Sequence, residues 1–192
     1  MSNLLASRFA TSDRLAIHDM EWLQQGMGVK TVKFDVGVGG LPPEVNWEDK
    51  AAAIAMIDNE PARSLASILI WSTDTNWDWS RHFDTVTCHL AENMIQRCNG
   101  DGRKGPRACK HTLSELAQLM ARMVLYFELY ELWDIYTVKG RLKFSSIEVN
   151  SSTYTNIWLT YQRHMIDDLV SMVNKIDCSI ARYRKNLNFE NS

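Results

Sequence analysis

The chain has few of the features that define the specialised classes of protein. It holds only four Pro in 192 residues, and 45% of its residues are apolar, which excludes a disordered, proline-rich chain. The most apolar run, around Ile68 to Trp71, is far too short to cross a bilayer. The first residues lack the apolar run of a secretory signal, so we expect a cytoplasmic protein with no membrane contact.

Cysteine pairs are also missing. The four Cys, at positions 88, 98, 109 and 178, form neither a disulfide framework nor a Cys-x-x-Cys pair. Structural zinc takes four N or S ligands, which usually come from such close pairs. Cys98, Cys109 and His111 share one segment and are the only weak metal candidates, so we expect reduced thiols and no cofactor.

No residue pattern typical of catalysis stands out. The sequence shows no Ser/His/Asp, Cys/His or paired-carboxylate arrangement that would position a nucleophile beside a base. We therefore interpret the chain as a protein that is not an enzyme.

The strongest pattern present is an apolar stripe on one long helix in the C-terminal region. Its members are spaced 4, 3, 4, 4, 3, 4, 4, 3 and 4 residues apart, an 11-residue repeat that keeps them on one face of a nearly straight helix. No Pro or Gly interrupts it, and Ser151 or Ser152 supplies an N-cap. The stripe consists of Tyr154, Trp158, Tyr161, Met165, Leu169, Met172, Ile176, Ile180, Tyr183 and Leu187.

The length of this helix suggests a partner. At 1.5 Å per residue, its 34 residues span roughly 50 Å, whereas a compact chain of this size has a radius of gyration near 16 Å and a diameter of about 42 Å. We expect the far end to meet a second copy. The predicted seam of a homodimer is formed by Ile176, Ile180, Tyr183 and Leu187.

The rest of the pattern predicts an all-α protein in two parts. Residues 1–138 read as a helical core, in which a capping box from Thr112 to Glu115 opens a long helix ending near Tyr136. Val32, Phe34, Val36 and Val38 alternate with polar residues and Gly, so an extended arm is expected at 29–40. Residues 139–192 are expected to form a helix-turn-helix-like module that continues into the long helix.

Charge is unevenly divided between the two halves. Residues 1–96 hold 7 Lys/Arg and 13 Asp/Glu, a net charge of −6, whereas residues 97–192 hold 14 and 10, a net charge of +4. A basic second half is compatible with nucleic acid bound through it, and equally with an ordinary solvated surface.

The helix-turn-helix candidate occupies about residues 139–162. Val149 stands where the turn needs a buried apolar side chain, and the polar residues after it can face phosphates or base edges. This segment lacks the usual small residue and turn Gly, so a capped helix after a polar turn is the alternative. The predicted DNA contacts here are Lys139, Arg141, Lys143, Asn150, Ser151, Ser152, Thr155 and Asn156.

The segment at 98–111 is the clearest loop, and it is rich in cations. Positive side chains in a flexible loop can hold the phosphate backbone without reading sequence, although a solvated loop is as plausible. The predicted contacts are Arg103, Lys104 and Arg107.

The second half resembles the phage late-gene antitermination proteins of the Q type. The resemblance rests on three short motifs: Cys98-Asn-Gly-Asp-Gly-Arg103, Glu148-Val-Asn-Ser-Ser-Thr-Tyr154 followed by Trp158, and Arg182-Tyr-Arg-Lys185. In that family, an amphipathic helix precedes a Cys- and Gly-rich zinc loop and a long C-terminal helix. The paired zinc cysteines are missing here. The resemblance implies binding to promoter DNA and contact with RNA polymerase.

Two functions follow as hypotheses. The first is a DNA-binding transcription regulator of phage or prophage type, for example an antitermination factor that contacts RNA polymerase. The alternative is a helical interaction module, a dimeric adaptor or an inhibitor of a host protein, whose acidic, Trp-rich first half docks the partner without DNA binding.

Overall fold

The structure is a computed structural model, and it describes residues 47–71, 78–106 and 110–190. Within these ranges the chain forms helices joined by turns and loops, with no strand, so the predicted all-α fold is confirmed. The arm expected at 29–40 lies outside the described residues. In chain order the helices are α3 (Trp47–Ala55), α4 (Glu60–Trp71), α5 (Ser80–Gly100), α6 (Leu113–Leu129), α7 (Val138–Phe144), α8 (Ser151–Thr153), the π-helix η1 (Tyr154–Trp158) and α9 (Leu159–Glu190).

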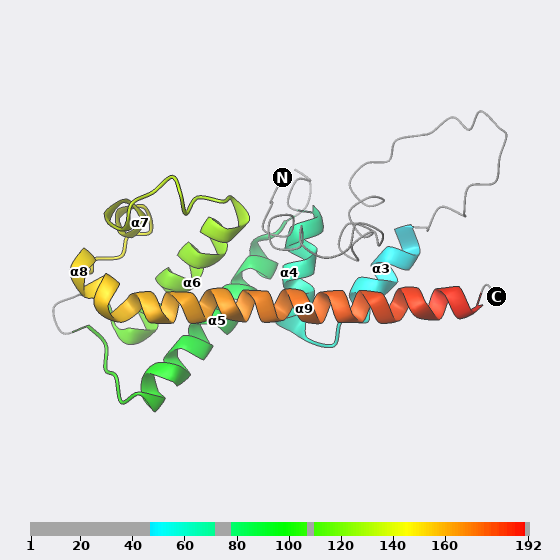
Figure 1. The fold of residues 1–192 in the computed structure, drawn as a ribbon, viewed down its shortest axis with the longest axis horizontal. Helices are drawn as coiled ribbons and strands as arrows, with labels where there is room; N and C mark the ends of the chain where they lie inside the picture. Colours follow the sequence, from blue (N-terminus) through cyan, green and yellow to red (C-terminus); the bar gives the residue numbers. More distant parts are fainter. Residues whose placement is uncertain (1–46, 72–77, 107–109, 191–192) are drawn as a thin grey trace.

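The C-terminal helix forms the long axis of the molecule. α8, η1 and α9 follow one another without a break, and α9 alone has 32 residues. The wide turn of η1 is closed by a hydrogen bond from the backbone N–H of Leu159 to the carbonyl of Tyr154. Figure 1 shows the other helices arranged along this axis, from α7 and α6 at one end to α3 near the other. None of the described helices combines the length and apolarity that a membrane span needs.

The predicted apolar stripe is the buried face of this axis. Its first eight residues, from Tyr154 to Ile180, are all buried, which confirms the reading of the 11-residue repeat. Tyr183 is half-buried, and its hydroxyl donates to Asp49 Oδ1 at 3.1 Å. The stripe therefore packs against four helices of its own chain, α3, α4, α5 and α6.

The predicted dimer seam is wrong for Ile176 and Ile180. Both side chains are fully buried within a single chain, so they have no surface to offer to a second copy. The prediction assumed a spherical chain shorter than the helix. The fold is instead elongated along α9, and α3 and α4 cover the distal part of that helix. The side chain of Leu187 lies outside the described residues.

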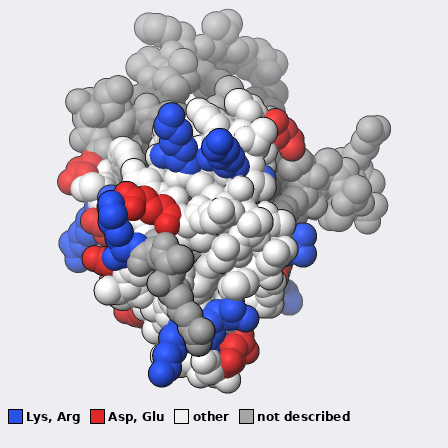
Figure 2. Space-filling model, turned by 90° about the vertical axis from the view of Figure 1, so that its left-hand side faces the viewer, with Lys and Arg blue, Asp and Glu red and all other residues white. Residues whose placement is uncertain are grey.

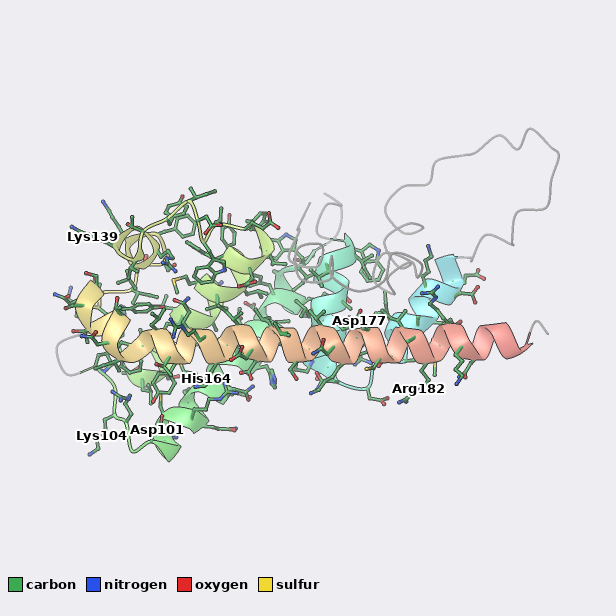
Figure 3. The ribbon with its side chains drawn as sticks, in the orientation of Figure 1. Asp101, Lys104, Lys139, His164, Asp177 and Arg182 are labelled. Atoms are coloured by element: carbon green, nitrogen blue, oxygen red, sulfur yellow. The ribbon has the colours of Figure 1, made fainter. Side chains whose placement is uncertain are left out.

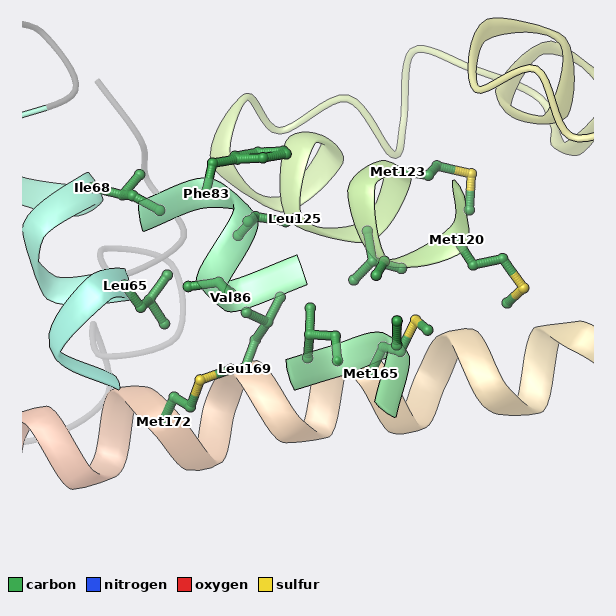
Figure 4. Close-up of a cluster of buried hydrophobic side chains, with 14 of the residues drawn as sticks. Leu65, Ile68, Phe83, Val86, Met120, Met123, Leu125, Met165, Leu169 and Met172 are labelled. Carbon is green, nitrogen blue, oxygen red and sulfur yellow. The ribbon is translucent and has the colours of Figure 1, made fainter. Parts of the chain in front are cut away.

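The core between these helices is rich in methionine. Flexible Met side chains fill the irregular gaps where α4, α5, α6 and α9 meet. Figure 4 shows this part of the core. The labelled members are Leu65 and Ile68 of α4, Phe83 and Val86 of α5, Met120, Met123 and Leu125 of α6, and Met165, Leu169 and Met172 of α9.

Three helices end in the same left-handed turn. After α5, α6 and α7 the chain passes through a residue with positive φ, at Gly102 (64°), Glu131 (54°) and Ser146 (56°). The next N–H donates to the carbonyl five residues back, at 2.7, 3.1 and 2.9 Å, as in a Schellman motif. Only one of the three has Gly there, which explains why the sequence wrongly extends α6 to Tyr136.

Candidate nucleic-acid interface

Two segments that the sequence assigns to DNA contact line one cleft at the α8 end of the molecule. The loop after α5 provides one part of the lining, and the region around α8 and η1 provides the rest. The cleft has a volume of about 620 Å³. Its lining carries two cations and no carboxylate among the described residues, which are Gly102, Arg103, Lys104, Gly105, Pro106, Val149, Asn150, Thr153, Ile157 and Trp158.

The first half of the loop is held against the long helix by Tyr161. The Tyr161 hydroxyl donates to Asp101 Oδ2 at 2.6 Å and accepts from Arg103 Nε at 3.2 Å. The Arg103 guanidinium also lies over the Tyr161 ring, 5.9 Å from its centroid. Burial, followed by the hydrogen bond to Asp101, raises the pKa of Tyr161 to about 12, so the phenol stays protonated at neutral pH. Arg103 therefore has a structural role besides the phosphate contact predicted for it.

The chain beyond the loop is tied to the turn before α8. The backbone N–H of Glu148 donates to His111 Nε2 at 3.1 Å, and the Glu148 carboxylate lies 3.4 Å from Lys110 Nζ. The ion pair is exposed and contributes little stability. The backbone hydrogen bond matters more, because it fixes where the second lining segment stands relative to the first.

The helix-turn-helix candidate contains two helices joined by a turn, but its turn is longer than is usual for this motif. α7 has 7 residues, and residues 145–150 connect it to α8, which is longer than the three to four residues usual for such a turn. Ser146 supplies the left-handed conformation that Gly usually gives. The buried apolar residue of the turn is Ile147, whereas Val149, predicted for that role, is only half-buried and lines the cleft.

The N-cap of the second helix is Asn150, so the prediction of Ser151 or Ser152 as the cap is wrong by one or two residues. Asn150 Oδ1 accepts from the Ser152 N–H at 2.9 Å and from its hydroxyl at 2.8 Å. Thr155 and Asn156 are exposed on η1, and the Thr155 hydroxyl donates to the Ser151 carbonyl at 2.9 Å. Asn156 is thus placed to meet a ligand, whereas Asn150, Ser152 and Thr155 also serve the backbone.

Under η1, a buried polar pair fixes the wide turn. The hydroxyl of Tyr154 donates to Gln162 Oε1 at 2.8 Å, and both side chains are buried. Burial raises the pKa of Tyr154 well above its usual value, so this donor persists at any physiological pH. Neither the π-helix nor its buried partner Gln162 has a signal in the sequence pattern.

The cations predicted on α7 differ in exposure. Lys139 and Lys143 are exposed. Arg141 is half-buried, with its guanidinium 5.2 Å from the centroid of the Trp133 ring and its Nε buried without a hydrogen-bond partner. The side chain of Arg141 thus contributes to packing against Trp133, and its predicted phosphate contact stays a prediction.

The remaining cations surround the end of the molecule. Figure 2 shows Lys and Arg side chains around this end, with largely uncharged surface between them, and acidic side chains beside the cations on the left and at the lower edge. In Figure 3, Lys139 and Lys104 project on either side of the start of the long helix. Arg107 lies outside the described residues.

Of the weak metal candidates, the structure describes Cys98 and His111. Cys98 is buried in the core, where burial raises the pKa of its thiol, and hydrogen bonding to Tyr161 lowers it only in part. His111 Nε2 accepts a backbone hydrogen bond, and Cys109 lies outside the described residues. Within the ranges that the structure describes, no three His, Cys, Asp or Glu side chains are grouped to hold a metal ion.

Comparison with known proteins adds no family to this picture. No protein-family model matches the chain, and no curated protein or solved structure shows a significant similarity to it.

Proposed function

We propose that the α8 end of the molecule binds nucleic acid, and that the protein is a DNA-binding regulator that acts without a catalytic step. The observation that carries this proposal is the shared cleft. Two segments assigned to DNA contact for separate sequence reasons, the loop at 102–106 and the region at 149–158, line one concave surface. That surface carries cations and no carboxylate among its described lining residues, which suits a polyanion.

The exposed side chains of this end have two different roles in the proposal. Lys104, which lines the cleft, and Lys139 and Lys143, on the helix α7 that contacts α8, neutralise phosphates, because each is exposed. Asn156, which is exposed on η1, reads a base edge, since an amide can donate and accept at once. The resemblance to phage antitermination proteins supports promoter DNA as the target and RNA polymerase as the second partner.

An anisotropy titration on a panel of DNA sequences tests the division of roles. Asn156→Ala should weaken binding to the preferred sequence by about 1–3 kcal/mol and relax the preference at one base pair. Lys143→Ala should weaken binding to all sequences alike. Both residues are exposed, so folding should survive in both variants. A wild-type protein that binds no DNA at low salt would overturn the proposal.

A second candidate function is docking of a protein, and one surface favours it. Beyond α6, large apolar side chains remain exposed at Tyr130, Ile135 and Phe144, and the rings of Tyr126 and Phe144 lie 5.7 Å apart. Exposed apolar patches often mark protein interfaces. Under this alternative, substitution of Tyr130 and Ile135 by Ser should abolish binding to the partner while the chain stays folded and shows no DNA affinity.

A further inference from the structure

The volume and the lining of the cleft indicate which kind of ligand it can bind. A volume of about 620 Å³ lies within the range of small-molecule sites. Its lining is divided by chemistry. Arg103 and Lys104 are charged, Asn150 and Thr153 are polar, and an apolar part remains. Pro106, Val149, Ile157 and Trp158 make up that apolar part.

Trp158, which contributes to the lining, has a second unusual feature. The side chain is almost fully buried, yet its Nε1 is buried with no hydrogen-bond partner. An unpaired buried donor costs about 1–3 kcal/mol, and most such groups in folded proteins have a partner. Trp158 is also the last residue of η1, and single π turns occur often at functional sites. An unsatisfied donor and an irregular turn therefore coincide at the cleft.

We infer that this cleft binds a nucleotide unit, with the planar base against the apolar lining and the phosphate at Lys104 and Arg103. The charge pattern favours this class of ligand, because an anionic group meets cations and no carboxylate among the described lining residues. A flat ring suits the apolar part of the lining, to which Ile157 and Trp158 contribute.

Such a nucleotide has two possible sources. It can be a free mononucleotide, or an unpaired nucleotide of a bound strand whose base has left the stack. The second source deepens the proposed function, because it makes the target of this end a site with an unpaired base. The first source is independent of DNA binding.

Three probes separate these sources: 2-aminopurine deoxyriboside 5′-monophosphate, a short single strand containing one 2-aminopurine, and the same strand paired into a duplex. Fluorescence titration gives an affinity for each. We expect the single strand to bind at least about tenfold more tightly than the duplex, a difference of about 1.4 kcal/mol. Val149→Trp should fill the cleft and remove this preference, and Lys104→Ala should weaken binding to the single strand.

Control variants keep the result interpretable. Met56→Trp adds the same side chain at a position that is 53% exposed and outside the cleft, and Lys175→Ala removes a lysine from the distal part of α9. Neither should change the preference. Circular dichroism checks the fold of Val149→Trp, and Lys104→Ala keeps the test valid if that variant is unfolded, since Lys104 is exposed.

Each outcome decides something. Tight binding of the free monophosphate that Lys104→Ala weakens supports the inference, and if no oligonucleotide binds, it also overturns the proposed function. Preference for the single strand alone supports the inference and assigns the nucleotide to a strand. Equal binding of strand and duplex that Val149→Trp leaves unchanged overturns the inference; if Lys104→Ala still weakens both, the proposed function stands. No binding of any probe overturns both.

Discussion

Arg97 of α5 and Asp168 of α9 form a two-pronged ion pair, with N–O distances of 2.7 and 2.6 Å. The pair is partly buried, and Asn93 donates a third hydrogen bond to the same carboxylate at 3.2 Å. This ion pair joins α5 to α9. Substitutions in the pair therefore test how strongly α9 is packed against the rest of the molecule.

Asp168→Asn should destabilise the fold by about 1.5–3 kcal/mol, the value of a hydrogen bond to a charged group. Burial tends to raise the pKa of Asp168, but hydrogen bonds from Arg97 and Asn93 outweigh it and lower that pKa. The stability from this carboxylate is therefore present above its unfolded pKa near 3.9 and lost as the pH falls through the lower, folded value.

Chemical denaturation at a series of pH values measures both effects. The variant should show a smaller loss of stability than wild type between about pH 5 and pH 3. The neighbouring Asp167→Asn is the matched control, because Asp167 is 76% exposed and lies 3.9 Å from His164, so its change should stay within about 0.5 kcal/mol. Equal effects of the two substitutions would show that the Arg97 pair does not hold α9.

The left-handed turns after α6 and α7 give a stabilising prediction. Glu131 and Ser146 adopt a positive φ that costs a side-chain-bearing residue about 1–2 kcal/mol and Gly almost nothing. Ser146→Gly and Glu131→Gly should each raise the free energy of unfolding by about 0.5–1 kcal/mol, less than the full strain because Gly also loses more entropy on folding. Denaturant midpoints measure this.

The reverse substitution provides the control. Gly102→Ala should be destabilising, because Gly102 has the same backbone conformation after α5. The added methyl group would meet no atom within 4 Å, so strain in φ, offset only in part by the smaller entropy loss of Ala, decides the sign. A Ser146→Gly variant less stable than wild type would contradict the turn described here.

The burial of the stripe leads to a prediction about assembly. Ile176→Ala should cost about 2–5 kcal/mol of stability, because the side chain is fully buried among helices of its own chain. The sedimentation coefficient of the folded protein should not change. Analytical ultracentrifugation of the wild type and the variant measures the sedimentation coefficient, and chemical denaturation measures the stability. A variant as stable as wild type but with an altered oligomeric state would restore the discarded dimer seam.

Tyr161→Phe tests whether the loop must be held for binding. The substitution removes the hydroxyl that connects Asp101 and Arg103 to α9, so affinity for DNA should fall although no contact residue is changed. The folded pKa of Tyr161 is about 12, whereas an unfolded tyrosine titrates near 10. Its contribution is therefore fully present below about pH 10 and lost as the pH rises towards 12.

The Phe variant should lose less stability than wild type over that alkaline range. Tyr183→Phe is the control, because it loses a hydroxyl bonded to Asp49 at the distal end. Unchanged DNA affinity in Tyr161→Phe would mean that the loop acts without this anchor.

The sequence was sufficient for the fold where the signals are local and periodic. The stripe from Tyr154 to Ile180 is buried as predicted, and the Thr112–Glu115 capping box is present. The error at the dimer seam has a physical cause: periodicity shows that a face is buried, not which chain covers it. The end of α6 was missed because Glu131 takes the place of the Gly that usually signals it.

The candidate site was predictable only in parts. Exposed Lys residues and the loop of Gly and cations are visible in the sequence, but the contacts that bring them together are not. The hydrogen bonds from Glu148 to His111 and from Tyr161 to Asp101 join residues that are 37 and 60 positions apart. A local sequence pattern cannot predict such contacts. Arg141 was assigned to phosphate because nothing near it in sequence reveals its stacking on Trp133.

The slope of log affinity against log salt for double-stranded DNA tests the central claim most directly. With Lys104, Lys139 and Lys143 all replaced by Ala, the account predicts a slope smaller by about 0.9 per contact, or about 2.7 units, and much weaker binding at low salt. A Lys175→Ala, Lys185→Ala variant, which removes exposed cations from the distal half of α9, should keep the wild-type slope. An unchanged slope in the triple variant, or an equal loss in the distal one, would contradict the assignment of nucleic-acid binding to the α8 end.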